Sequence, residues 1–139
     1  MILLDTNVVS AFMQREIDPI VLSWLDDQPA ESIWTTAITV FEVRMGLELL
    51  AAGRRRRLME EAFTKMIEEE FEGRVLSFDS AAAQVSGRIA AEPRQAGRTV
   101  EFRDVQIAGI AAARKSAIAT RNVRHFSGLG LKVIDPWKV

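Results

Sequence analysis

The sequence predicts an α/β fold in three layers, with a mainly parallel central sheet of four to five short strands flanked by helices. Two observations support it. Short apolar runs alternate along the chain with longer segments whose apolar residues recur at helical spacing. The 139 residues, 48% hydrophobic and 27% charged, are enough for one compact domain, so residues 1–139 are expected to form a single domain.

The first half of the chain shows strands and helices in alternation. The apolar run at the start ends at Asp5-Thr6-Asn7, residue types that cap helices and make tight strand-to-helix turns. Asp18 followed by Pro19 is typical of a helix start. The expected elements are a strand over 2–4, a helix over 19–28, a strand over 32–36 and a helix over 38–50 that ends at Gly53.

The second half continues the alternation. An amphipathic helix is expected after Gly53, and Asp79 is expected to cap a later helix that Pro93 kinks or ends early. The expected elements are helices over 54–70, 79–97 and 100–115, and strands over 75–78, 117–120 and 132–134.

The composition limits the possible partners and metals. A net charge of −1 and a pI near 5.9 give no overall attraction to nucleic acid. With no cysteine and one histidine, His125, a thiolate or histidine-rich metal site is excluded, which leaves oxygen ligands. The apolar start is too short for a signal peptide, and no apolar run reaches the roughly 18 residues of a membrane span. We therefore expect a cytoplasmic protein with no membrane contact.

Three acids occupy positions where the local pattern favours apolar residues. Asp5 follows the first strand, at the edge where parallel sheets bind ligands. On the helix of Glu42, residues at helical spacing form a mostly apolar stripe: Ile38, Thr39, Met45, Gly46 and Leu49. Asp104 likewise shares a helix face with Ile107, Ala108 and Ala111. A buried carboxylate must become protonated, pair with a base or bind a cation.

Two interpretations of these acids remain open. Glu42 and Asp104 can be ion-pair partners of arginines, or reach water at the rim of the core. Alternatively, Asp5, Glu42 and Asp104 converge as catalytic and metal-binding residues for Mg²⁺ or Mn²⁺, the ions that favour carboxylate oxygens. Such an ion binds a phosphate oxygen and lowers the pKa of water, which suits phosphodiester hydrolysis.

Four segments together resemble the PIN-domain family, and in particular the VapC-type toxins of bacterial toxin-antitoxin pairs. The segments are Leu3–Val8, Thr39–Gly46, Asp104–Ala108 and Thr120–Phe126. The terminal Pro136-Trp137 is similar to a subgroup that includes FitB. The resemblance implies a Mg²⁺- or Mn²⁺-dependent endoribonuclease, with Asp5, Glu42 and Asp104 at the family's acidic positions.

The resemblance also implies partners. They are a cognate VapB-like antitoxin that inserts a segment into the active-site groove, an RNA substrate with tRNA as a candidate, and a second copy of the chain. A higher assembly with the antitoxin would reach operator DNA only through the antitoxin.

Polar residues near the acids are candidates for a supporting role. Thr6 and Asn7 match the family's polar turn, and the hydroxyl of Thr6 can orient a ligand beside Asp5. The last motif contributes Thr120, Asn122 and His125. Family members commonly have a fourth acid at the position of Asn122 or His125, and its absence here favours one dominant metal. For His125, a surface or packing role is favoured over direct participation.

Basic residues are candidates for contact with RNA or the antitoxin. The run Arg54–Arg57, of which Arg54 and Arg55 are candidates, starts a helix whose N-terminus already carries partial positive charge. Phosphate contact or an acidic partner would explain this run, and simple solvation is the alternative. Arg44, Arg121 and Arg124 are expected to line a groove near the acids. The tryptophans are expected to pack in the core or an interface.

Three other functions compete with an RNA nuclease. A haloacid-dehalogenase-like phosphatase needs a second Asp where Asn7 stands. A PIN fold that acts as a binding or regulatory protein with weak catalysis is compatible with the missing fourth acid. A metal-dependent DNA nuclease would use the same acids, because DNA and RNA share the phosphodiester.

Overall fold

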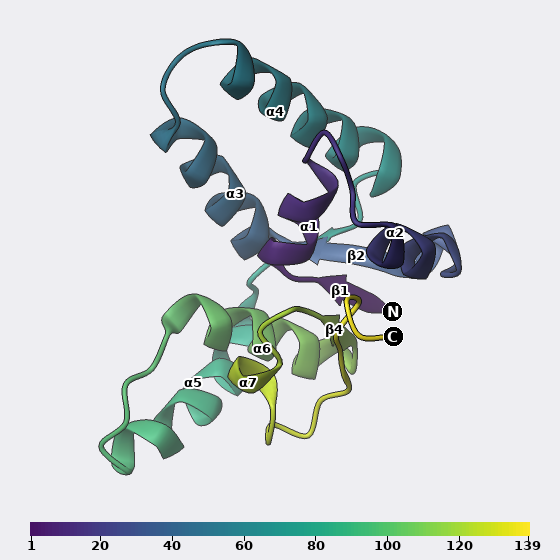
Figure 1. Cartoon of the computed structure of the whole chain (residues 1–139). Helices are drawn as coiled ribbons and strands as arrows, with labels where there is room; N and C mark the ends of the chain where they lie inside the picture. The colour runs from purple at the N-terminus through teal and green to yellow at the C-terminus, as the bar shows by residue number, and fades with distance from the viewer.

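The central sheet of the computed structural model, which describes residues 1–139, is entirely parallel. Its strands are β1 (Ile2–Leu4), β2 (Ile33–Thr36), β3 (Val75–Leu76), β4 (Ala117–Ala119) and β5 (Val133–Ile134). Their spatial order is β3-β2-β1-β4-β5, so the N-terminal strand lies in the middle. The chain ends lie side by side (Figure 1). The predicted α/β class and strand number are confirmed.

The helices follow the strands in sequence. They are α1 (Thr6–Phe12), α2 (Pro19–Asp26), α3 (Ala37–Leu49), α4 (Arg54–Lys65), α5 (Ser80–Gln95), α6 (Phe102–Arg114) and the short α7 (Val123–Phe126). A 3-10 turn, Ala30–Ser32, precedes β2, and a π-helical turn, Met66–Glu70, extends α4. In Figure 1, α1 to α4 lie on one side of the sheet and α5 to α7 on the other. None of these helices has the length and apolar character that a membrane span requires.

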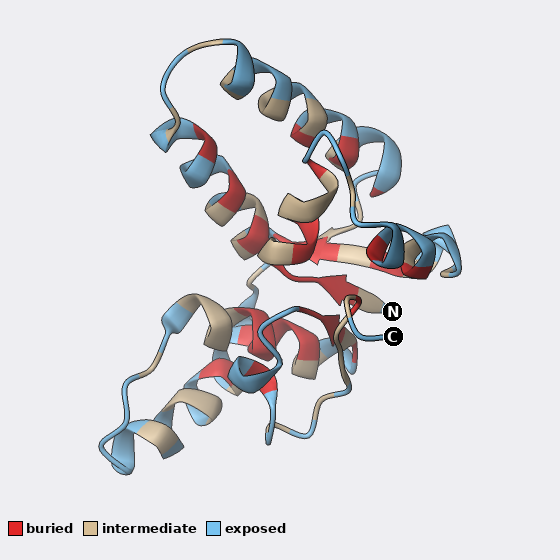
Figure 2. Ribbon diagram, viewed as in Figure 1, coloured by how far each residue is buried: buried red, intermediate tan, exposed pale blue.

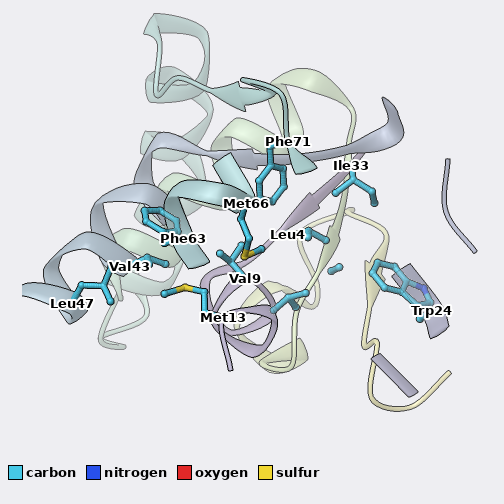
Figure 3. Packing of buried hydrophobic residues seen from close by; sticks show 12 residues of the cluster. Leu4, Val9, Met13, Trp24, Ile33, Val43, Leu47, Phe63, Met66 and Phe71 are labelled. Atoms are coloured by element: carbon cyan, nitrogen blue, oxygen red, sulfur yellow. The ribbon is translucent and has the colours of Figure 1, made fainter. Parts of the chain in front are cut away.

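The core has two parts, one on each face of the sheet, because successive side chains of a strand point to opposite faces. Leu4 of β1 packs with residues of α1 to α4, such as Val9, Val43 and Phe63. Its neighbour Leu3 packs in a second cluster with residues of α5, α6 and α7. Figure 3 shows the first cluster, and Figure 2 shows burial concentrated on the strands and the helix faces turned toward them. The three-layer prediction is therefore confirmed.

A glycine lets α5 and α6 approach closely. A Cβ atom at Gly109 would lie 2.7 Å from the carbonyl oxygen of Ala82 and would overlap the hydroxyl of Ser86. Ser86 in turn donates to the carbonyl of Val105 at 3.2 Å. This packing fixes the position of α6, the helix that carries Asp104.

Several element boundaries differ from the expectation. Gly53 does not end α3, which stops at Leu49; it precedes Arg54 as the N-cap of α4. Pro93 does not end α5, which continues to Gln95; its missing N–H removes one helical hydrogen bond, and the helix stops two residues later. The short α7 was not expected, since four residues are too few for a helical period.

Candidate active site at the carboxyl edge of the sheet

Asp5 is held at the carboxyl end of β1 by backbone pairing with β4. The register pairs Leu4 with Ala119, which brings Asp5 beside Thr120, and the Asp5 N–H donates to the Ala119 carbonyl at 2.9 Å. Only 3% of Asp5 is exposed. Its Oδ1 accepts from the Thr6 N–H at 2.8 Å, and its Oδ2 accepts from the Thr120 hydroxyl at 2.8 Å and the Asn7 amide at 3.3 Å.

Asn7 and Thr120 join the turn after β1 to the loop after β4. The Asn7 amide also donates to the Thr120 hydroxyl at 3.3 Å, and its Oδ1 accepts from the Arg121 N–H at 3.0 Å. The Asn122 N–H donates to the Thr120 hydroxyl at 3.0 Å, while the exposed side chain of Asn122 makes no bond. No buried side-chain polar atom lacks a partner. Of the polar residues singled out in the sequence, Thr6, Asn7 and Thr120 therefore form one network around Asp5.

Glu42 reaches the same edge from α3. The Thr36 hydroxyl accepts from the Thr39 N–H at 3.0 Å, which starts α3 directly after β2. One turn further, Glu42 Oε1 accepts from the Thr6 hydroxyl at 3.0 Å, and its Oε2 lies 3.8 Å from Nη1 of Arg103. Thr6 thus links Glu42 to the helix that begins at Asp5.

The stripe expected around Glu42 is buried only at its start, near Thr39, and the expectation was wrong for Met45, Gly46 and Leu49, which are exposed. The buried residues of α3 are Thr39, Val43 and Leu47, whereas Met45 is 39% and Leu49 is 79% exposed. The reason is that α3 packs by one face against α1 and α4 and projects from the sheet, so its other side faces solvent (Figures 1 and 2). Glu42 lies at the border of the buried face.

Asp104 approaches from α6, and here the inward stripe is confirmed. Ile107, Ala108 and Ala111 are buried. Because α6 leads into β4, it runs back across the sheet and begins near the carboxyl edge, with Asp104 in its first turn. Asp104 Oδ2 lies 2.6 Å from Nδ1 of His125 on α7. His125, for which the sequence identified no partner, therefore contacts one of the three acids.

The pKa values of the three acids show that they interact. Burial raises the pKa of Asp5, and the hydrogen bonds from Thr120 and Thr6 oppose that rise. Burial also raises the pKa of Glu42, with further increases from the negative charges of Asp5 and Asp104. Burial and the charge of Asp5 raise the pKa of Asp104, whereas His125 lowers it. Each acid is less easily ionised because of burial, and Glu42 and Asp104 also because of neighbouring acids.

The chemistry of this donor set fits a hard cation such as Mg²⁺, because it consists of carboxylate oxygens whose ionisation is disfavoured. The present arrangement is not a closed cage, since no three acidic or histidine side chains are grouped to hold an ion. Arg103 instead pairs with Glu42, and His125 contacts Asp104. The ion-pair interpretation thus holds for Glu42, and a cation would have to compete with these contacts.

Arg44 does not line a groove near the acids, contrary to the expectation. Its guanidinium pairs with Glu48 and Glu60, and Arg56 pairs with the same two acids at 2.6 and 2.7 Å. This network fastens α3 to α4. Arg54 and Arg55 are exposed at the start of α4, at the end of the α3–α4 hairpin that projects from the sheet (Figure 1), so the site does not include them.

The remaining basic candidates lie in the last motif. The guanidinium carbon of Arg121 is 4.7 Å from the centroid of the Trp137 ring, which ties the C-terminal segment to the loop after β4. Arg124 is exposed on α7. Trp24 is buried, in line with the expected packing role. Arg103 was missed, because only the tertiary contact between α3 and α6 brings it to Glu42; its place directly before Asp104 was the available signal.

Comparisons with known proteins agree on one family. A family model described as the PIN domain matches residues 2–130. Three relatives match over 99% of both chains: "Plasmid stability protein StbB" of Pseudomonas syringae pv. tomato at 41% identity, "VapC ribonuclease Y4jK" of Sinorhizobium fredii at 37%, and "Toxin FitB" of Neisseria gonorrhoeae at 34%.

Solved structures show the same likeness. The crystal structure of FitAcB from Neisseria gonorrhoeae contains a chain 33% identical, with a TM-score of 0.89 over all of both chains. The structure of FitAB bound to the IR36 DNA fragment gives a TM-score of 0.88, also at 33% identity, over all of this chain and 97% of that one. The chain therefore belongs to the PIN domain family and, within it, to the group that includes the VapC and FitB proteins.

Proposed function

We propose that this chain is a Mg²⁺- or Mn²⁺-dependent endoribonuclease and the toxin of a toxin-antitoxin pair. The observation that carries the proposal is that Asp5, Glu42 and Asp104 lie at the carboxyl edge of the sheet, near enough for their charges to interact, and that each has a raised pKa. The acids support metal-assisted phosphodiester hydrolysis, and the relative named VapC ribonuclease supports RNA as the substrate.

In this proposal the three carboxylates hold the ion. A bound Mg²⁺ or Mn²⁺ would place positive charge against the phosphate oxygens and acidify a water molecule. Asp5 provides a fixed oxygen, because Thr6, Asn7 and Thr120 leave its side chain little freedom. Thr6 orients Glu42 toward Asp5 through its hydroxyl.

Arg103 and His125 have two tasks in this mechanism. Without an ion they offset the charges of Glu42 and Asp104. Both side chains remain partly exposed, at 39% and 51%, so each can turn to the substrate when the acids engage a cation. The guanidinium of Arg103 is then the natural donor to a non-bridging phosphate oxygen.

The partners we propose are a VapB- or FitA-like antitoxin and a second copy of the chain, with operator DNA reached through the antitoxin. The solved FitAcB and FitAB structures support the antitoxin. An exposed apolar stripe on α3, made of Phe41, Met45 and Leu49, supports a protein partner on that side. We further propose that residues 1–139 act as a single domain in the cytoplasm, where RNA substrates are found.

The test is cleavage by the purified chain, freed of antitoxin. Wild type is incubated with tRNA, single-stranded RNA and DNA in Mg²⁺, Mn²⁺ or EDTA, beside Asp5→Asn and the matched control Asp27→Asn, an exposed residue of the α2 C-cap. We expect RNA cleavage by wild type and control, and none in EDTA or with Asp5→Asn. Cleavage that survives EDTA would contradict the mechanism.

The other outcomes identify the competing functions. Cleavage of DNA in preference to RNA would assign a DNA nuclease. Hydrolysis of phosphate monoesters alone would assign a phosphatase, although Asn7 here only binds Asp5, Thr120 and Arg121. Metal binding with no cleavage would assign a binding or regulatory protein, the alternative that the non-acidic Asn122 and His125 favour.

A further inference from the structure

A cavity of about 520 Å³ adjoins the acid site through Asp104 and its contact His125, which are both part of the cavity lining. It lies between the C-terminal end of α5, the start of α6 and α7. Its volume is in the range of small-ligand sites. The remaining lining residues are Ile89, Glu92, Pro93, Arg98, Thr99, Val100, Glu101, Val105, Ser127, Gly128 and Leu129.

The walls of this cavity suit a nucleobase better than a phosphate. Aliphatic side chains, including Ile89 and Leu129, offer surface for the face of a ring. Glu92 and Glu101 join Asp104 in the lining, so acids outnumber Arg98, the lining's one permanent cation. A phosphate would be repelled inside, whereas the N–H groups of a base would be accepted.

Glu92 is the carboxylate available to a base. Glu101 is occupied, since its Oε1 accepts from the Arg103 N–H at 3.2 Å and lies 3.4 Å from Nε of Arg103. Glu92 is exposed at the end of α5 and has no ion pair or side-chain hydrogen bond. Exocyclic amino groups of cytosine, adenine and guanine are donors that a carboxylate accepts, whereas uracil has carbonyl oxygens in place of an amino group, and a carboxylate repels them.

The rim of the cavity is preorganised by the end of α5. The N–H of Arg98 donates to the Pro93 carbonyl at 2.8 Å, and Gly97, at φ +75°, makes the turn that allows it. Arg98 stands at the rim of the cavity with no ion pair.

We propose that this cavity binds the unpaired RNA base next to the scissile phosphate and favours bases with an amino group over uracil. The proposal rests on the proposed function. Because Asp104 belongs to both the cavity and the acid site, a nucleotide in the cavity has its phosphate near the acids. Glu92 accepts from the amino group, and Arg98 contacts the backbone on the outer side.

The first experiment maps cleavage of a single-stranded RNA library with randomised positions. Thr99→Trp fills the cavity from an exposed loop position, with Thr64→Trp, exposed on α4, as its control. Glu92→Gln removes the acceptor charge, with Glu61→Gln as its control. We expect wild type to discriminate against uridine at one position beside the cut.

Thr99→Trp should lower kcat/KM by about 10- to 100-fold and abolish the preference, because the base loses its binding surface. Glu92→Gln should reduce discrimination against uridine by roughly 10-fold, mainly by lowering kcat/KM for substrates that carry an amino-bearing base at that position. Both controls should behave like wild type. Equal rates and equal preferences in all five proteins would overturn the base site while leaving the proposed function intact.

A second experiment does not require cleavage. CMP and UMP are titrated into the wild-type protein, and amide shifts are followed by NMR. We expect CMP to shift amides over residues 92–105 with at least a few-fold tighter Kd than UMP, and Thr99→Trp to lose the shifts. A wild type that cleaves no RNA yet binds CMP in this way would overturn the proposed function only. No shifts over these residues would overturn the base site.

Discussion

The two sides of the acid site are built differently. Asp5 lies at a strand end, is 3% exposed, and accepts three hydrogen bonds from the turn and loop around it. Glu42 and Asp104 lie on helices, have side chains 20% and 19% exposed, and each contact a partly exposed basic side chain, Arg103 or His125. The side of the site formed by Asp5 is fixed, and the side formed by Glu42 and Asp104 is held by contacts that can be exchanged.

The difference indicates which acids can exchange their contacts and which cannot. A fully buried acid needs a network of donors to persist, and the Asn7–Thr120 network provides it. Glu42 and Asp104, which lie on helices, can instead exchange a basic side chain for a metal ion without leaving a buried charge unpaired. Asp5 should therefore be essential for cleavage, and the contributions of Glu42 and Asp104 should depend on the metal concentration and on pH.

The largest expected effect is on the fixed side. Asp5→Asn should lower the single-turnover rate of RNA cleavage by at least about 1,000-fold, because the anchoring negative oxygen is lost while the size of the side chain is kept. Circular dichroism should remain that of wild type. A folded variant with more than about a tenth of wild-type activity would show that Asp5 is not the anchor.

The helix acids should matter somewhat less when changed singly. Glu42→Gln and Asp104→Asn should each lower the cleavage rate by about 100- to 1,000-fold, since Asp5 and the remaining acid still attract an ion. Raised Mn²⁺ should recover part of the loss. If either variant is unaffected while Asp5→Asn is inactive, that acid belongs to the ion-pair network alone.

A divalent ion should stabilise the wild type. At roughly 100 times Kd, Mn²⁺ binding to the folded state should raise the unfolding temperature by roughly 5 to 15 °C. Asp5→Asn should show little of this increase, whereas Asp27→Asn should show all of it. An equal increase in all three proteins would place the bound ion elsewhere.

The network around Asp5 can be tested without touching an acid. Thr120→Val removes the hydroxyl that donates to Asp5 and accepts from the Asn122 N–H, and it should lower kcat by about 10- to 100-fold. The hydroxyl also lowers the pKa of Asp5, so the acidic limb of the pH–rate profile should move to higher pH. A variant that changes KM alone would argue for a role in substrate binding.

The smallest expected effect is on stability without metal. The pKa of Glu42 is raised above 4.5 in the folded protein, so the folded state binds more protons and loses stability as pH rises from about 4.5. Glu42→Gln avoids that loss and should melt a few degrees above wild type near pH 7, with no difference near pH 4. Glu61→Gln serves as the control. A Glu42→Gln protein that melts lower than wild type at neutral pH would mean that the pair with Arg103 outweighs burial.

Local patterns in the sequence were sufficient for most of the fold and for Asp5. The Ile2–Leu4 strand and the acid after it can be recognised without tertiary information, and so can the inward stripe of Asp104. The face of α3 could not be assigned, because Met45 and Leu49 are apolar but exposed. Periodicity shows that a helix has an apolar stripe, but not whether that stripe lies in the core or on the surface.

Contacts between segments far apart in the sequence could not be predicted from local patterns either. The pairing of His125 with Asp104 and of Arg103 with Glu42 depends on how α6, α7 and α3 pack at one edge. Arg44 illustrates the opposite error: its position near Glu42 in sequence suggested the site, but one further turn of α3 offers Glu48 as a closer partner. The partners of Arg103 and His125 depend on tertiary packing, whereas the i,i+4 spacing of Arg44 and Glu48 was visible in the sequence.

The most direct test of the account is the location of the ion. A crystal of the wild-type chain grown with Mn²⁺ should give an anomalous scattering peak within coordination distance of an Asp5 carboxylate oxygen and of at least one oxygen of Glu42 or Asp104, with Arg103 or His125 moved away from its acid. A peak that does not involve Asp5, or acids that keep their ion pairs at saturating Mn²⁺, would contradict the claim that these carboxylates form one metal site.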